Sequence, residues 1–136
     1  MANSDFDAKP IPESGMDLIE RPLVMALATT LADGTPQVTP VWFSYEDGHI
    51  LFNSARGRLK DRAIRANPYV AMTIVDPNNP YHYVAIRGPV VEITEEGARE
   101  HINALAKRYT GRDTFSGSPD EVRVIYRLKP QHVLAQ

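Results

Sequence analysis

The chain has 136 residues, 43% of them hydrophobic and 24% charged, and a formal net charge of -2 at pH 7. This length and composition predict a single globular domain with a substantial core. Because it has no cysteine, the chain forms no disulfide or thiolate metal site, and its slightly acidic charge argues against nucleic acid as a partner, which requires a broad basic surface.

The N-terminal segment, residues 1–13, contains two prolines and no periodic pattern, so we predict a flexible arm before one domain at residues 14–136. The segment lacks the pattern of a signal peptide, and no run of about 18 apolar residues predicts a membrane span. We therefore expect a cytoplasmic protein with no membrane partner. A short helix is predicted over residues 14–20, because Pro22 disfavours its continuation.

Three strands are predicted next. Residues 23–29 form a continuous apolar run, and residues 37–45 are rich in β-branched and aromatic side chains. The pair Asp33-Gly34 predicts a hairpin turn between these two strands, and Asp47-Gly48 predicts a second turn leading to residues 49–53. The three strands together predict an antiparallel meander.

A basic segment follows, with a helix predicted from Gly57 to Asn67. Arg58 and Lys60 fall in its first turn, where the helix dipole disfavours a cation and favours an anion. Backbone N–H groups at a helix start, with Arg and Lys beside them, form a phosphate site. The alternative is a solvated helix face, on which Asp61 pairs with Arg65 four residues later. The segment holds five cations in ten residues: Arg56, Arg58, Lys60, Arg62 and Arg65.

The second half of the chain predicts three more strands, which are residues 69–75, 83–93 and 122–128. Gly88-Pro89 inside the middle one predicts a curve. Thr94 is predicted to cap a helix with apolar residues at helical spacing, and residues 130–136 are predicted to be a tail. Six strands joined mostly by tight turns predict a mainly β fold, a small closed or partly closed antiparallel barrel.

Two aromatic segments and one arginine are further candidates for binding. Pro40, within residues 37–43, implies an edge or a bulge whose free backbone groups could bind a planar heterocycle, or an edge protected against aggregation. Residues 80–83 are suited to stack on a ring, to line an interface or to form a cross-strand aromatic cluster. Arg87 requires an anion or an acidic partner, of which Glu92 is one option.

The sequence predicts no catalytic residue and no metal site. The four histidines lack metal-ligand spacing, and the serines lack the context of a nucleophile elbow. If the chain is an enzyme, a cofactor must supply the chemistry while the fold binds and orients it.

Several segments, in this order, are typical of one known family: residues 27–31, 33–34, 38–43, 54–60, 76–83, 86–88 and 107–111. With them the chain resembles the flavin- and deazaflavin-dependent oxidoreductases of the pyridoxamine 5'-phosphate oxidase-like split-barrel superfamily. It is most similar to the coenzyme F420-dependent branch of that superfamily, the PPOX class. The resemblance implies a six-stranded split barrel of the FMN-binding type and a homodimer with two cofactor sites at the subunit interface.

The resemblance also implies roles for particular residues. The cofactor phosphate would lie on Arg58 and Lys60, the strand around Pro40 would lie along the ring system, and residues 81–83 would come from the partner chain. The candidate cofactor-binding residues are Thr39, Val41, Trp42, Asn53, Ser54, Arg56, Arg58, Lys60, Arg62, Tyr81, His82, Tyr83 and Arg87.

The identity of the cofactor follows from the charge of its tail. FMN ends in one phosphate, whereas F420 continues through a phosphodiester into a lactyl-oligoglutamate tail, and five clustered cations exceed the needs of one phosphate. We therefore expect an F420-dependent oxidoreductase that transfers a hydride between the cofactor and a small unsaturated or aromatic substrate. The alternatives are an FMN-binding oxidoreductase and a non-catalytic flavin- or tetrapyrrole-binding protein.

Overall fold

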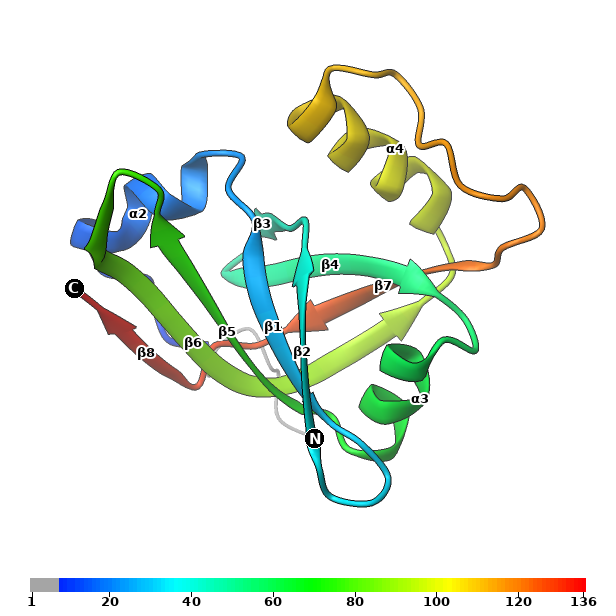
Figure 1. Cartoon of the computed structure of the whole chain (residues 1–136), viewed down its shortest axis with the longest axis horizontal. Helices are drawn as coiled ribbons and strands as arrows, with labels where there is room; N and C mark the ends of the chain where they lie inside the picture. Colours follow the sequence, from blue (N-terminus) through cyan, green and yellow to red (C-terminus); the bar gives the residue numbers. More distant parts are fainter. Residues whose placement is uncertain (1–7) are drawn as a thin grey trace.

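The computed structural model describes residues 8–136, and residues 1–7 of the predicted arm lie outside the described residues. The described part has eight strands and three helices (Figure 1). In chain order they are α2 (Glu13–Glu20), β1 (Met25–Thr30), β2 (Pro36–Val41), β3 (Ser44–Glu46), β4 (His49–Ala55), α3 (Leu59–Ala66), β5 (Tyr69–Asp76), β6 (Asn79–Thr94), α4 (Ala98–Thr110), β7 (Arg123–Leu128) and β8 (His132–Ala135). No helix within residues 8–136 has the length and apolarity needed to cross a membrane.

The strands are antiparallel and pair in the order β2-β1-β5-β6-β7-β4-β3, with β8 added on β6. Within the described residues the two end strands do not pair with each other, so the sheet does not close. This confirms the predicted mainly β split-barrel fold. The strand count is eight rather than six, because residues 37–45 form two strands and the predicted tail contains a strand.

The predicted three-stranded meander is wrong, because the chain leaves the sheet ladder at Trp42 and Phe43. The side chain of Phe43 is fully buried in the core, and its backbone N–H donates to the hydroxyl of Tyr109 at 3.2 Å. As a result β2 pairs only with β1, and β3 starts a separate hairpin with β4. The break places Trp42 beside α4.

Strand β6 runs through both halves of the sheet (Figure 1). Its first part pairs with β5 and β8, and its last part pairs with β7 from Val90 on, with a bulge between Val90 and Glu92. The curve predicted at Gly88-Pro89 is the point where β6 crosses from the half of the sheet that contains β5 to the half that contains β7. A Cβ atom on Gly88 would lie 2.0 Å from the backbone oxygen of Lys129, so two backbones approach each other closely here.

The core fills the space between the sheet halves and is closed by helices. Phe52 and Tyr126 stack at its centre, with ring centroids 5.0 Å apart. Ile11, just before α2, is also buried. The largest fully buried side chains are Tyr126, Phe43, Phe52, Leu18, Met25, Leu27, Ile50, Ile64, Ile74, Ile86, Leu128 and His49.

A buried carboxylate fixes the start of α3. Asp61 accepts hydrogen bonds from the Gly57 N–H at 2.9 Å, the Tyr126 hydroxyl at 2.6 Å and Arg65 Nε at 2.9 Å, which confirms the predicted pair with Arg65. Burial by itself would raise the pKa of Asp61, but these hydrogen bonds and the Arg65 charge lower it below its ordinary value. The ionised side chain thus anchors the turn that carries Arg58.

Helix α4 begins later than predicted. Its N-cap is Gly97, with φ of 75°, whereas Thr94 ends β6 and accepts a hydrogen bond from the Glu96 N–H at 3.1 Å. Because β6 continues to Thr94, the chain needs a turn before the helix, and Gly97 supplies its left-handed backbone conformation.

Candidate functional site

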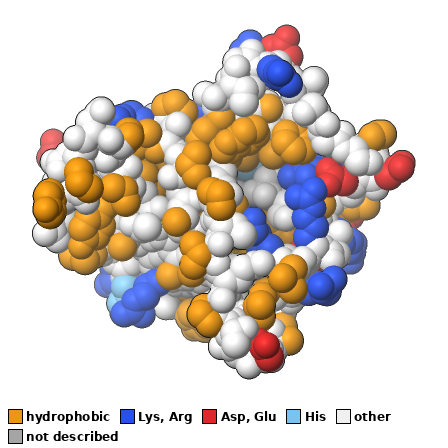
Figure 2. Space-filling model, viewed as in Figure 1, with side chains coloured by type: hydrophobic (Ala, Val, Ile, Leu, Met, Phe, Trp, Pro, Cys, Tyr) orange, Lys and Arg blue, Asp and Glu red, His pale blue; other side chains and the backbone are white. Residues whose placement is uncertain are grey.

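A cavity of about 400 Å³ lies over β4, between α3 and α4. Figure 2 shows a hollow on this face, bordered by hydrophobic side chains on one side and by Lys and Arg side chains on the other. The cavity has the size typical of a small-molecule site. Its lining consists of Val24, Pro40, Val41, Trp42, Asn53, Ser54, Arg58, Lys60, Ile102, Leu105 and Phe115.

The basic end of the cavity is formed by the start of α3. Arg58 is the N-cap of the helix and Lys60 lies in its first turn, as predicted. No side chain of the described residues caps the helix start. Among residues 8–136, Lys60 has no hydrogen-bond or ion-pair partner. Burial, followed by the charges of Arg58 and Arg123, lowers the pKa of Lys60. A half-buried cation without a counter-charge favours an anion in the cavity.

Glu121, from the loop before β7, lies beside these cations. Its carboxylate pairs with Arg58 through one oxygen and with Arg123 through the other, the latter at 3.1 Å. The sequence separation between Arg58 and Glu121 is 63 residues, so the pair leaves no local signal. Arg123 itself is only 5% exposed, and its guanidinium lies 5.0 Å from the ring centre of Phe115.

The other three cations of the basic segment point to partners outside the cavity. Arg56 pairs with Glu95, Arg62 donates to the Gly57 carbonyl at 2.8 Å, and Arg65 pairs with Asp61. None of the three lines the cavity. The sequence predicted that the five cations would act together on one ligand. In the structure, Arg58 and Lys60 are the two of these five that line the cavity.

The apolar end of the cavity is built on Trp42. Its indole stacks on Tyr109 with a centroid distance of 5.3 Å and meets Phe115 edge to face at 6.1 Å. The Tyr109 hydroxyl donates to the Leu23 carbonyl at 2.7 Å and fixes the stack. Thr39, on the preceding strand, does not line the cavity. This flat aromatic wall suits a planar ligand.

A chain of buried hydrogen bonds supports the cavity floor. Arg123 Nε donates to Asn53 Oδ1 at 2.9 Å, and Asn53 Nδ2 donates to the Ala98 carbonyl at 3.0 Å and to His101 Nδ1 at 3.1 Å. Because Nδ1 accepts, the imidazole proton is on Nε2, which donates to Ser44 Oγ at 3.0 Å. Burial lowers the pKa of His101 to about 4, in keeping with this neutral tautomer.

We expect His101 to make the protein sensitive to acid. The unfolded chain binds a proton at a pKa of about 6.5 and the folded chain only near 4, so stability is fully present above pH 6.5 and falls as the pH drops toward 4. Between pH 7 and pH 4.5 this group alone should remove about 2.5 kcal/mol from the free energy of unfolding. Urea unfolding of the wild type and of His101→Asn at both pH values measures the difference.

The His101→Asn variant should lose less stability on acidification by about that amount. Replacing the exposed His132 by Asn serves as the matched control and should leave the wild-type acid loss unchanged. An equal acid loss in the wild type and in His101→Asn would contradict the prediction.

The residues predicted to come from a partner chain lie at the far end of the molecule. Tyr81 is 81% exposed at the β5–β6 turn, and His82 pairs with Asp17 at 2.9 Å. The Tyr83 hydroxyl donates to the Gln136 side chain at 3.3 Å. None of the three lines the cavity beside α4 within one protomer.

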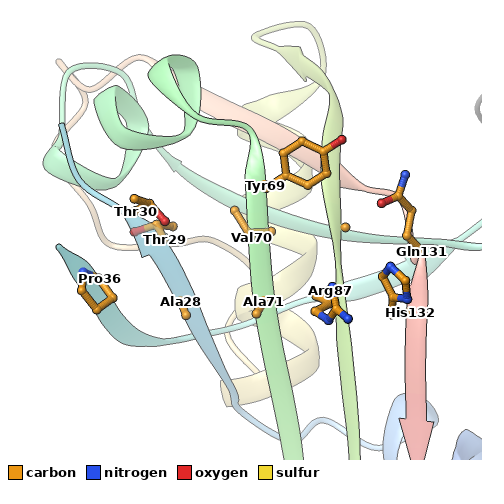
Figure 3. Close-up of a pocket in the computed structure, with 11 residues that line it drawn as sticks. Ala28, Thr29, Thr30, Pro36, Tyr69, Val70, Ala71, Arg87, Gln131 and His132 are labelled. Atoms are coloured by element: carbon orange, nitrogen blue, oxygen red, sulfur yellow. The ribbon is translucent and has the colours of Figure 1, made fainter. Parts of the chain in front are cut away.

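Arg87 lies in a different depression, of about 260 Å³, on the outer face of the sheet (Figure 3). Ala28, Ala71, Arg87 and His132 are consecutive neighbours across β1, β5, β6 and β8. Glu92, the acidic partner considered from the sequence, pairs instead with Arg127 at 3.1 Å.

Sequence reasoning missed Phe115, Glu121, Arg123 and His101 at this site. The one usable signal was Arg123, a charged residue at the start of an apolar strand, which requires a partner when buried. Phe115 and Glu121 stand in a Gly- and Ser-rich loop whose path cannot be read from a local pattern.

Among known proteins, the pyridoxamine 5'-phosphate oxidase family matches residues 11–136. A solved structure described as an F420 reductase is 39% identical, with a TM-score of 0.84, and the match covers 93% of this chain and 100% of that one. Rv2991, a conserved hypothetical protein from Mycobacterium tuberculosis, is 25% identical over 93% of this chain and 84% of that one, with a TM-score of 0.71.

General Stress Protein 26 from Bacillus anthracis, 20% identical with a TM-score of 0.67 over 89% of each chain, shares the fold. No match was found among curated proteins.

Proposed function

Because the chain belongs to the pyridoxamine 5'-phosphate oxidase family, we propose that it is an oxidoreductase of this class that uses coenzyme F420. The cofactor binds in the cavity between α3 and α4, and a hydride passes between it and a small unsaturated or aromatic substrate. The observation that carries the proposal is the cavity itself, which places Arg58 and Lys60 opposite an aromatic wall at Trp42, with Lys60 unpaired among residues 8–136. The 39% identical F420 reductase supports the choice of cofactor.

The side chains of the cavity fit a planar ring that ends in an anion. Arg58 and Lys60 hold the phosphate, while Val41 and Trp42 lie along the ring system, with Asn53 and Ser54 between the two ends. When bound, the deazaflavin supplies or accepts the hydride. The chain's own residues bind and orient the cofactor, and the apolar lining excludes water from the ring.

FMN is the second candidate, and one observation favours it. Only two of the five cations face the cavity, which is what a single phosphate needs, because Arg56 and Arg62 already contact Glu95 and the Gly57 carbonyl. The number of cations at positions 56–65 therefore does not by itself favour F420 over FMN. The preference for F420 now depends on the similarity to the F420 reductase.

A homodimer is part of the proposal, and the outer face of the sheet supports it. Small side chains, Ala28 and Ala71, leave a shallow surface there, and the neighbouring Val38 and Leu134 are 64% and 54% exposed. A second copy packed on this face would cover these apolar groups. It would also bring its own Arg87 into the interface, along with residues 81–83.

A parallel titration with F420 and FMN tests the proposed function. Trp42 is the only tryptophan of the chain, so its fluorescence reports directly on the cavity, and cofactor fluorescence gives a second signal. We expect F420 to bind with a Kd of about 10 μM or tighter, and its reduced form to reduce members of a panel of enones and quinones. Sedimentation equilibrium of the same samples measures the dimer.

Absence of F420 binding at about ten times that concentration would overturn the choice of cofactor. Binding of FMN alone would establish the second candidate. Tight binding of either cofactor without hydride transfer to any substrate of the panel would assign the chain as a carrier or sensor.

A further inference from the structure

Glu121 lies beside Arg58, one of the two cations that line the basic end of the cavity. Its two carboxylate oxygens are divided between Arg58, which lines the cavity, and Arg123, which is buried behind it. The backbone oxygen of Glu121 also accepts a hydrogen bond from Arg99 at 3.0 Å. An anion in the cavity therefore faces two cations with a carboxylate beside them.

Glu121 cannot leave when an anion arrives, because Arg123 depends on it. The Arg123 guanidinium is enclosed by Asn53, Phe115 and Glu121, and a buried cation deprived of its counter-charge is strongly unfavourable. The loop is also closely packed, since a Cβ atom on Gly117 would lie 2.7 Å from Glu121 Oε1 and 2.5 Å from the Phe115 ring.

Arg58 is the most exposed member of this group. Its side chain is 54% exposed, compared with 19% for Glu121. It can turn toward a ligand while Glu121 stays with Arg123. The negative charge of Glu121 thus remains close to the bound phosphate.

We propose that Glu121 is a specificity-determining residue that weakens the preference of the cavity for a dianionic phosphomonoester over a monoanionic phosphodiester. This inference rests on the proposed role of the cavity in binding a phosphate-bearing cofactor. Arg58 and Lys60 attract a dianion about twice as strongly as a monoanion, and the fixed carboxylate repels a dianion about twice as strongly, so Glu121 reduces the advantage of the monoester. The diester is the form of phosphate in F420, and the monoester is the form in FMN.

Two small esters with the same ring test the inference without either cofactor. Methyl phenyl phosphate is a monoanion, whereas phenyl phosphate at pH 8 is a dianion because its second pKa is about 6. Quenching of Trp42 fluorescence measures the Kd of each ester. We expect Glu121→Gln to shift the ratio of the two Kd values toward the monoester about tenfold relative to the wild type.

Glu121→Asp keeps the charge and should keep the wild-type ratio. Glu95→Gln is the matched control, because it removes a carboxylate from the Arg56 pair outside the cavity, and it should also keep the ratio. Lowering the pH from 8 to 5.5 converts most phenyl phosphate to a monoanion, so the shift between the wild type and Glu121→Gln should shrink at pH 5.5.

An unchanged ratio in Glu121→Gln, an equal shift in Glu121→Asp or Glu95→Gln, or no binding of either ester would overturn the inference. The outcome is separate from that for the proposed function. If Glu121→Gln shifts the ester ratio but the protein does not bind F420, this inference stands and the proposed cofactor is wrong. If the protein binds F420 but the ratio does not shift, the proposed cofactor stands and this inference is wrong.

Discussion

Replacing Arg58 and Lys60 together by alanine is expected to abolish cofactor binding, with a loss of at least about 100-fold in affinity. The two side chains are the only cations of the basic segment that line the cavity. In the proposed complex each would form a charge-assisted hydrogen bond to the phosphate. Such a bond contributes about 1.5–3 kcal/mol, so the loss of two exceeds the factor of 100. Fluorescence titration of the variant with F420 and FMN measures the effect.

The matched control removes two cations elsewhere. Lys107 and Arg127 form ion pairs with Asp113 and Glu92 outside the cavity, and their joint replacement by alanine changes the net charge by the same amount. This control should bind the cofactor as the wild type does. Equal weakening in both double variants would mean that overall charge, rather than the cavity, governs binding. Circular dichroism confirms that each variant is folded.

Gly88→Ala should reduce the free energy of unfolding by about 3 kcal/mol or prevent folding. The new Cβ atom would lie 2.0 Å from the Lys129 oxygen, a backbone atom that cannot swing aside. The backbone is bonded on both sides of this contact, by the Lys129 N–H to the Pro89 carbonyl at 2.9 Å and by the Gln131 N–H to the Arg87 carbonyl at 3.0 Å. Relief of the clash must therefore break strand pairing.

Urea unfolding followed by circular dichroism measures this effect. The control Glu92→Ala, on the same strand, removes an exposed ion pair and should cost only about 0.5 kcal/mol. A Gly88→Ala protein as stable as Glu92→Ala would show that the sheet halves can separate at this point without cost.

The sequence predicted those parts of the fold that depend on local pattern. The Asp-Gly turns, the apolar strands and the three helices have periodicity or turn chemistry that neighbouring residues determine. The break at Phe43 could not be predicted, because it depends on a hydrogen bond to Tyr109, 66 residues away. Strand β8 was missed because its four residues show only a weak alternation of polar and apolar side chains. They form a strand because they pair with β6.

In the candidate site, too, the features set by local sequence were predictable and those set by distant contacts were not. The position of Arg58 and Lys60 at a helix start was predictable, since it needs only the strand, the turn and the first helical residues. Their electrostatic environment was not predictable, because Glu121 and Arg123 come from the other end of the chain. The roles assigned to Thr39 and to residues 81–83 remain predictions about a bound cofactor and a second protomer.

Strand β6 also governs how the chain can fold while it is being synthesised. Strand β1 pairs with β5 as its second neighbour, and β4 pairs with β7, so the two early hairpins each have an unpaired edge until residues 69–128 have been synthesised. Pairings this distant in sequence form slowly, and unpaired strand edges are prone to aggregation. We therefore expect the nascent chain to be prone to aggregation until β7 has left the ribosome.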